Sequence, residues 1–192
     1  MRLRQKMEAG IDEVGRGCLS GPVFAAAVIL PEGFKNSLIK DSKKLSYKKR
    51  KEAFNIIKEN AISVGIAKIM PDEIDRINIL QATFMAMFGA IDDMKETPTK
   101  LMVDGDRFPG YKNINHECII KGDSKVLSIA AASIIAKVTR DEYMEQLAEE
   151  FPQYAWEKNY GYGTAEHMNA IEKHGLTKWH RKSFCSRFLV NN

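Results

Sequence analysis

The sequence predicts an α/β fold in which helices flank one mixed β-sheet, followed by a helical C-terminal part. First, the chain has 192 residues, 44% of them hydrophobic and 28% charged, the balance of a globular domain with one full-sized core. Second, strand-like apolar runs come first and then alternate with segments of helical periodicity. Third, no stretch is rich enough in Pro, Gly or Ser to mark a linker. We therefore expect a single domain over residues 1–192, with a core at about 1–150 and a helical part at about 151–192.

The first half of the chain alternates between strand and helix patterns. Apolar runs that end at Gly, Pro or polar residues predict strands at 9–14, 23–30 and 61–69. Ser46 is a suitable N-cap for a helix over residues 46–60, whose apolar side chains share one face. Pro71 opens a stretch with apolar residues at helical spacing, which predicts one helix that reaches about residue 95.

The second half repeats the alternation and then becomes helical. Two short apolar runs predict strands at 100–104 and 116–121. The first is followed by Gly105 and the second by Gly122 and Asp123. A long alanine-rich pattern predicts a helix over residues 124–150, and a last helix is expected at 165–174. Strands that alternate with helices in this way indicate one sheet covered by helices.

Charge permits a nucleic-acid partner without requiring one. The net charge is +4, from 29 Lys and Arg against 25 Asp and Glu, which is a mild excess. The cations concentrate at residues 40–51 and 178–187, where they fit either a nucleic-acid contact or two solvated surface segments.

The cysteines and the apolar runs bear on the compartment. Cys18, Cys118 and Cys185 are widely spaced and form no CxxC pair, so the sequence offers no support for a zinc knuckle or a redox dithiol and favours free thiols in a reducing compartment. The first residues lack an apolar h-region, and the longest apolar run is too short to span a bilayer. We expect a cytoplasmic protein with no membrane segment.

Carboxylates end three strand-like runs, at Asp12-Glu13, Asp104 and Asp123. Aspartate has a poor strand propensity, and a charge beside a core is costly unless a partner compensates it. Several acids at one sheet edge repel one another, and a divalent cation turns that repulsion into binding. Ligation by oxygen alone suits magnesium or manganese rather than zinc. The pattern therefore predicts a divalent metal site formed by these four acids.

Local explanations remain open for some of the acids. Asp123 could be an N-cap of the helix that follows it, and Asp104 could be a turn residue before Gly105. Asp12 has no such explanation, because the turn begins only at Gly15. Glu13 raises a geometric question, since adjacent side chains of a regular strand point to opposite faces of the sheet.

Such a site could hydrolyse a phosphodiester with two metal ions. Ions roughly 3.5–4 Å apart would activate a water and stabilise the leaving 3′ oxygen. Asp12 and Asp104 are the best candidates to bind both ions, and Glu13 and Asp123 would complete the two coordination shells. No Ser, Cys or His nucleophile is then needed.

The ordered motifs around these acids resemble type 2 ribonuclease H (the ribonuclease HII family) from about residue 8 to residue 188. In sequence order the motifs are Ile-Asp12-Glu13-Val-Gly15-Arg16-Gly17, Asp41-Ser42-Lys43-Lys44-Leu45, Val103-Asp104-Gly105, Lys121-Gly-Asp123 with the helix after it, Gly161-Tyr162-Gly163-Thr164 and His180-Arg181-Lys182-Ser183-Phe184. The resemblance implies a ribonuclease H-like fold and an endonuclease that cuts the RNA strand of RNA–DNA hybrids. It also implies cleavage 5′ to single ribonucleotides embedded in duplex DNA, a 3′ hydroxyl and a 5′ phosphate as products, and dependence on Mg²⁺ or Mn²⁺.

The resemblance also implies which residues bind the substrate. The Gly15-Arg16-Gly17 turn would bring its backbone close to a ribose 2′-hydroxyl, the group that distinguishes RNA from DNA. Tyr162 would pack against the next sugar and admit only DNA there, although a half-buried core tyrosine is the alternative. Contacts with phosphates, which add affinity without sequence information, are implied for a further set: Ser42, Lys43, Lys44 and Arg181.

Some positions depart from the family pattern, and other functions need to be considered. Cys18 stands where proline is usual, and Tyr160 replaces a common lysine, which puts one phosphate contact in question. Type 3 ribonuclease H tends to carry Gly-Lys-Gly, whereas this chain has Arg16 between its glycines. A hybrid-binding protein without activity would have no reason to keep four acids, and a junction resolvase would not need Gly-Arg-Gly or Tyr162.

We expect a monomer that acts on RNA–DNA hybrids and on duplex DNA with embedded ribonucleotides. A sliding-clamp contact is possible in principle but has no support in the sequence, since only Leu-Val-Asn-Asn follows Phe188.

Overall fold

The computed structural model describes residues 7–40, 42 and 45–189, and its centre is a mixed five-stranded sheet. The strands lie in the order β3-β2-β1-β4-β5, so β1 occupies the middle. β1 pairs antiparallel with β2 and parallel with β4, while β2–β3 is antiparallel and β4–β5 is parallel. The strands are β1 Glu8–Val14, β2 Val23–Ile29, β3 Ser63–Ile69, β4 Lys100–Asp104 and β5 Asn115–Ile119. The predicted mixed sheet is confirmed.

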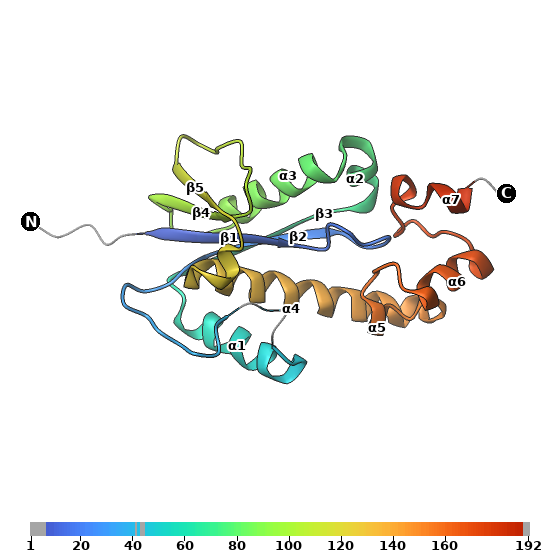
Figure 1. Ribbon diagram of the computed structural model, residues 1–192, viewed down its shortest axis with the longest axis horizontal. Helices are drawn as coiled ribbons and strands as arrows, with labels where there is room; N and C mark the ends of the chain where they lie inside the picture. The colour runs from blue at the N-terminus through green and yellow to red at the C-terminus, as the bar shows by residue number, and fades with distance from the viewer. Residues whose placement is uncertain (1–6, 41, 43–44, 190–192) are drawn as a thin grey trace, which may run out of the picture.

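Helices cover both faces of this sheet (Figure 1). α2 and α3 lie on one face, α4 and α1 lie on the other, and the C-terminal helices follow beyond the sheet end to which β1 points. None of the helices in the described part of the chain is long and apolar enough to cross a membrane. The helices are α1 Tyr47–Asn60, α2 Pro71–Ile77, α3 Ile79–Asp92, α4 Leu127–Glu150, α5 Trp156–Asn159, α6 Ala165–His174 and α7 Ser186–Leu189, with 3-10 turns η2 Gly122–Ser124, η3 Pro152–Tyr154 and η4 Lys182–Phe184.

Small residues let the helices approach the sheet closely. All seven residues of β2 are buried, and they alternate between the two cores: Ala25 and Ala27 face the α3 side, while Ala26 and Val28 face the α4 side. On β1, a Cβ atom added at Gly10 would lie 2.0 Å from the backbone carbon of Ser128 in α4. The strand therefore packs against the helix backbone itself, which fixes α4 relative to the acid-bearing end of β1.

Two helix predictions need correction. The single helix predicted from Pro71 to about residue 95 is two helices, because Asn78 has a φ of 70° and interrupts the regular backbone. Its side chain then accepts hydrogen bonds from the backbone N–H groups of Leu80 and Gln81 and so caps the start of α3. The helix predicted from residue 124 begins only at Leu127, because Lys121, with a φ of 56°, leads into the η2 turn.

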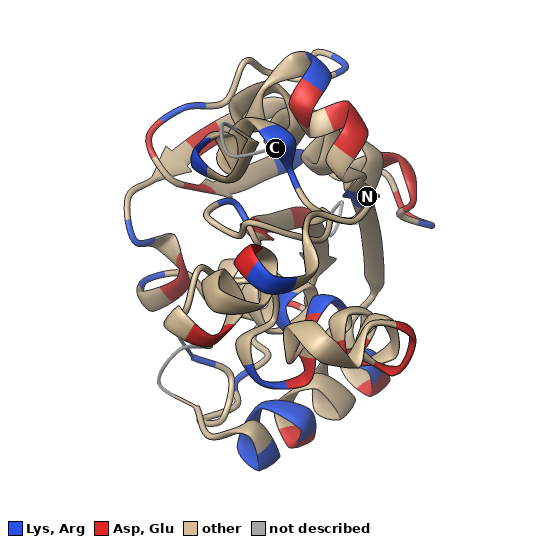
Figure 2. Cartoon of the chain, turned by 90° about the vertical axis from the view of Figure 1, so that its right-hand side faces the viewer, with Lys and Arg blue, Asp and Glu red and all other residues tan. Residues whose placement is uncertain are grey.

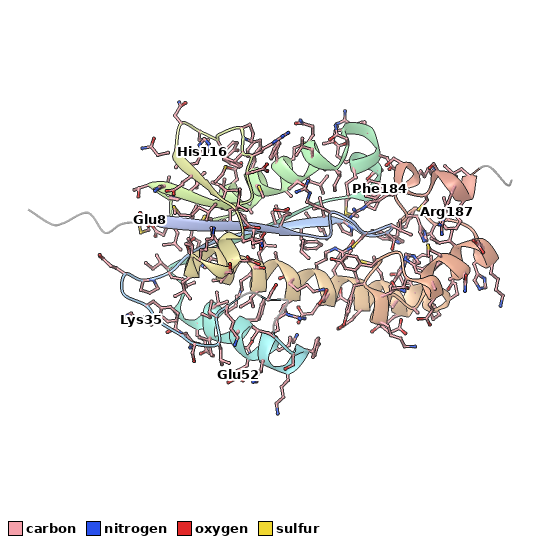
Figure 3. The ribbon with its side chains drawn as sticks, in the orientation of Figure 1. Glu8, Lys35, Glu52, His116, Phe184 and Arg187 are labelled. Carbon is pink, nitrogen blue, oxygen red and sulfur yellow. The ribbon has the colours of Figure 1, made fainter. Side chains whose placement is uncertain are left out.

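The C-terminal part packs on the second half of α4 and on α2. A third apolar cluster joins Met144 and Leu147 of α4 to Tyr154, Trp156 and Ile171. The carboxylate of Asp75 in α2 accepts hydrogen bonds from the backbone N–H groups at positions 182 and 183. Figure 3 labels Phe184 near this contact and Glu8 at the opposite end of the sheet. The predicted helical C-terminal part is confirmed, and α4 links it to the sheet.

Candidate active site

The parallel pairing of β1 with β4 brings Asp12 and Asp104 together. The paired register ends at Ile11 and Val103, so the two aspartates are the next residues on adjacent strands. Both line a hollow of about 370 Å³, together with Glu13 and with side chains from α4 and the C-terminal part. The other lining residues are Val14, Ser42, Ser133, Lys137 and Tyr162.

Glu13 reaches this hollow without breaking the alternation of the strand. Asp12 lies on the α4 side, where it bonds to Ser133, whereas Glu13 also lines a second hollow on the α3 side with Leu80 and Phe84. The pairing of β1 with β4 ends at Ile11 and Val103, and β4 itself ends at Asp104. Beside Glu13 there is therefore no β4 strand to keep the side chains on the two faces of β1 apart. Glu13 and Asp104 border both hollows. The end of β4 thus resolves the geometric question that the sequence raised.

Of the four acids, Asp12 has the least favourable environment for a charged carboxylate. Its side chain is 6% exposed, and burial raises its pKa well above the ordinary value, with repulsion from Glu13 and Asp104 adding to the rise. A hydrogen bond with Ser133 and one from the backbone N–H of Glu13, at 2.8 Å, act in the opposite direction. A nearby cation would relieve both the burial and the repulsion.

Glu13 has one cationic partner. Burial raises its pKa, and Arg16 opposes that rise through an ion pair whose Nη1–Oε1 distance is 3.2 Å. The negative charge of Asp104 raises the pKa further. The Arg16 side chain is half exposed, so this ion pair is screened by water.

Asp104 and Asp123 are linked through the η2 turn but line different hollows. The backbone N–H of Gly122 donates to Asp104 Oδ1 at 2.6 Å. Asp123, the next residue, lines a neighbouring hollow with Ile39 and Lys40. The N-cap of α4 is Val126, so the capping explanation for Asp123 is wrong. The structure brings three of the four predicted acids around one hollow, and the fourth lies beside them.

The donor set fits a hard divalent cation. Asp12, Glu13 and Asp104 present carboxylate oxygens, and no thiol or imidazole lines their hollow within the described residues. In the same part of the chain, no three acidic, histidine or cysteine side chains are already arranged in a ligand cluster. Glu13 and Asp104 repel the charged form of Asp12, and an oxygen-ligated Mg²⁺ or Mn²⁺ would offset this repulsion.

α4 contributes two polar residues that the sequence analysis missed. Ser133 bonds to Asp12, and its Oγ lies 3.0 Å from Oγ of Ser42, so it bridges the acids and the predicted phosphate-contact loop. Lys137, one helical turn later, lines the same hollow and donates to Asp141 at 2.7 Å. The signal was present: Ser133 and Lys137, at i and i+4, are the two polar residues in the otherwise apolar stretch 129–138. Ser42 itself is buried beside this pair.

The glycines of the Gly15-Arg16-Gly17 turn have different surroundings. Gly15 has a φ of +90°, and an added Cβ atom would lie 2.2 Å from Nε of Arg140, so both backbone and packing require glycine. At Gly17 a Cβ atom would meet nothing within 4 Å. The protein itself leaves that side of the turn open, as a close approach by a ligand requires.

Tyr162 lines the acid hollow and remains partly exposed. Its side chain is 40% exposed, which a core tyrosine would not be, and partial burial raises its pKa to about 12. Its backbone is fixed on both sides: the N–H donates to the Asn159 carbonyl at 2.9 Å, and the carbonyl accepts from His167 Nδ1 at 2.9 Å. The backbone that carries this aromatic ring is therefore held beside the hollow.

Of the remaining predicted phosphate contacts, the structure argues against that of Arg181 and does not describe those of Lys43 and Lys44. Arg181 is fully buried, and its guanidinium donates to the backbone carbonyls of Arg16 and Gly21 at 2.8–3.0 Å. The predicted phosphate contact of Arg181 does not fit this burial, since its donors are directed at the loop behind the site. Lys43 and Lys44 lie outside the described residues. Figure 2 shows that Lys and Arg are spread over many elements and do not form one continuous face.

Comparison with known proteins gives a consistent result. The family model of ribonuclease HII matches residues 9–189. A ribonuclease HII of Christiangramia forsetii is 57% identical over 176 residues, which cover 92% of this chain and 89% of that protein.

Two solved structures share the fold. Ribonuclease H2 from Pyrococcus horikoshii aligns with a TM-score of 0.78 and 26% identity, covering 96% of this chain and 99% of that one. Ribonuclease HII from Archaeoglobus fulgidus, solved in a complex with PCNA, aligns with a TM-score of 0.73 and 27% identity, covering 91% and 93% of the two chains.

Proposed function

This chain belongs to the ribonuclease HII family and is a ribonuclease H that acts on RNA–DNA hybrids, and from this premise we propose the details of its reaction. It hydrolyses the RNA strand internally and also cuts 5′ to a single ribonucleotide embedded in duplex DNA. The products carry a 3′ hydroxyl and a 5′ phosphate.

The observation that carries the proposal is the environment of Asp12. A carboxylate that is 6% exposed and lies beside Glu13 and Asp104 is unfavourable in isolation, and its raised pKa expresses that cost. Perturbed acids of this kind in a hollow mark functional sites more often than structural ones. In this site they would hold divalent cations, Mg²⁺ or Mn²⁺.

Four acids would share the cations. Asp12 and Asp104, which are on adjacent strands, would hold the cations together with Glu13 and Asp123. The chemistry that two bound ions supply is activation of the attacking water and stabilisation of the leaving 3′ oxygen. Ser133 holds Asp12 in place through its hydrogen bond, and Arg16 orients Glu13.

Other residues would recognise the sugars and phosphates of the substrate. The open side of Gly17 gives the backbone of the Gly15-Arg16-Gly17 turn room to contact a ribose 2′-hydroxyl. The ring of Tyr162, at the rim of the same hollow, would pack against the following sugar and exclude a second 2′-hydroxyl. Phosphate contacts are proposed for a basic and polar set: Ser42, Lys43, Lys44 and Lys137. Arg181 would act on the turn rather than on a phosphate.

A set of three duplexes tests the proposal directly: one with a single embedded ribonucleotide, one of DNA only, and a long RNA–DNA hybrid. Each is incubated with Mg²⁺, with Mn²⁺ and with chelator, and the products are mapped by gel electrophoresis. We expect a single cut 5′ to the ribonucleotide, several cuts in the hybrid, and none with chelator. Cutting of the DNA-only duplex, or activity that survives the chelator, would contradict the proposal.

The compartment and the assembly stay proposals as well. We propose that the chain works as a monomer in the cytoplasm. The PCNA complex concerns the Archaeoglobus protein, and we propose no clamp contact for this chain.

A further inference from the structure

Arg140 of α4 contacts both of the segments that flank the proposed substrate-binding residues: the loop after the Gly15-Arg16-Gly17 turn and the segment just before Tyr162. Its side chain is fully buried. Nε donates to the Pro22 carbonyl at 2.9 Å and Nη2 to the Ser20 carbonyl at 3.1 Å, both in the loop after the glycine turn. Nη1 donates to the Tyr160 carbonyl at 2.8 Å, two residues before Tyr162. One guanidinium therefore joins two segments that are about 140 residues apart in the sequence.

The Arg140 guanidinium also packs near Gly15 and Tyr162, which belong to the two segments that are proposed to contact the sugars. A Cβ atom at Gly15 would lie 2.2 Å from Nε of Arg140. The guanidinium carbon lies 6.0 Å from the ring centroid of Tyr162, within the range of a cation–π contact. The position of Arg140 thus limits how close the turn and the tyrosine can come to each other.

Among the described residues, backbone hydrogen bonds join the same two segments at one acceptor, the Gly161 carbonyl. The N–H groups of Leu19 and Ser20 donate to the Gly161 carbonyl at 2.8 and 3.3 Å. Because this backbone contact has a single acceptor, the angle between the two segments depends on packing and on side-chain contacts, such as that of Leu19 with Gly163. The three bonds of Arg140, which reach the Ser20 and Pro22 carbonyls in the loop and the Tyr160 carbonyl just before Gly161, supply one such contact.

The chemistry favours arginine for this task. A guanidinium is planar and directs its donors in a rigid fork, whereas a lysine ammonium is a point charge on a flexible stem. Burying the Arg140 charge among neutral carbonyls costs desolvation free energy. An apolar side chain would fill the same space without that cost, so packing alone does not explain an arginine here. Arg181 shows the same arrangement but reaches only the loop, at Arg16 and Gly21.

We propose that Arg140 is a positioning residue that sets the spacing between the Gly15–Gly17 turn and Tyr162, and so determines how strictly the enzyme requires a ribonucleotide followed by DNA. This inference rests on the proposed function. It assigns no contact between Arg140 and the substrate. Its effect is on selectivity between substrates rather than on the cleavage step at the acids.

The test measures kcat/KM on the embedded-ribonucleotide duplex and on a uniform hybrid, and takes the ratio of the two. For Arg140→Lys, which keeps the charge but not the fork, we expect this ratio to fall about tenfold, a change that corresponds to one lost charged hydrogen bond. The control variant is Ile57→Ala, a buried position in α1, which lowers the melting temperature while leaving the ratio unchanged. Arg140→Gln, which keeps part of the fork, provides a second variant if the lysine form does not fold.

A double-mutant cycle separates positioning from general loosening. If Arg140 acts through the alignment of Tyr162, then Tyr162→Ala and Arg140→Lys together lower the ratio no further than Tyr162→Ala alone. Additive losses, or an unchanged ratio in a folded Arg140 variant, would overturn the inference. Wild-type enzyme that does not cut the embedded-ribonucleotide duplex would instead refute the proposed function, so the two failures can be told apart.

Discussion

At the scale of single residues, the local sequence pattern ranked the acids unequally, and the structure explains why. Asp12 is the most buried and the most repelled, and it was the acid without a turn or capping explanation. Glu13 was questioned because strands alternate, and it lines both hollows because β4 ends beside it. A pattern in one segment could not show where the neighbouring strand stops, since that depends on pairing between distant segments.

Tyr162 gives a prediction at this scale. Tyr162→Ala removes the ring from the rim of the hollow and leaves the backbone bonds to Asn159 and His167 in place. We expect cleavage of the embedded-ribonucleotide duplex to fall about tenfold or more, and cleavage of a uniform hybrid to fall much less, because only the junction presents a DNA sugar to the ring. Initial rates on the two substrates give the comparison. An equal loss on both would mean that Tyr162 has only a structural role.

At the scale of elements, strands were easier to predict than breaks in helices. The predicted strands coincide closely with β1 to β4 because apolar runs bounded by Gly and Pro are local signals. Asn78 was missed because the apolar spacing continues through it, while its positive φ and its capping bonds break the backbone. The Arg140 and Arg181 contacts join segments far apart in sequence, so no local pattern could predict them.

A pair of buried histidines links α6 to the loop before η4. The Trp156 indole N–H donates to His167 Nε2 at 3.0 Å, and His180 Nε2 lies 3.2 Å from the same atom. His180 Nδ1 accepts from the Thr177 backbone N–H at 2.9 Å, and His167 Nδ1 faces the Tyr162 carbonyl. These contacts fit two neutral rings with hydrogen on Nε2 of His180 and on Nδ1 of His167, and the lone pair of His167 Nε2 is then shared between the N–H groups of Trp156 and His180.

This pair predicts a loss of stability in mild acid. Burial lowers the pKa of His167, and burial together with the charge of His167 lowers that of His180 to about 3. The unfolded chain, with an ordinary pKa near 6.5, then takes up protons that the folded chain does not. Stability is therefore complete above about pH 6.5 and falls below it, by up to about 1.4 kcal/mol per pH unit for each histidine.

Thermal unfolding between pH 8 and pH 5 measures this effect. The wild-type melting temperature should fall more steeply below pH 6.5 than that of His180→Gln, whose side chain takes up no proton in this range. Parallel curves for the two proteins would show that His180 makes no contribution to the pH dependence.

At the scale of the whole molecule, the fold places the acids where the two halves of the chain meet. β1 and β4 supply three of them, α4 supplies Ser133 and Lys137, and the C-terminal part supplies Tyr162. The sequence predicted the sheet, the acids and the helical C-terminal part, while their relative placement came from long-range packing such as the contact of Gly10 with α4. The extent of the domain, from residue 1 to residue 192, stays a prediction.

The most direct test of the account is Asp12→Asn, measured for both stability and activity. In chelator, the variant should melt about 2–4 °C above the wild type, because it loses a buried charge that Glu13 and Asp104 repel, a gain of roughly 1 kcal/mol. With Mg²⁺ or Mn²⁺, its cleavage of the embedded-ribonucleotide duplex should fall by about a thousandfold or more. A variant that melts lower than the wild type in chelator, or one that still cuts at near wild-type rates with metal, would contradict a catalytic metal site centred on Asp12.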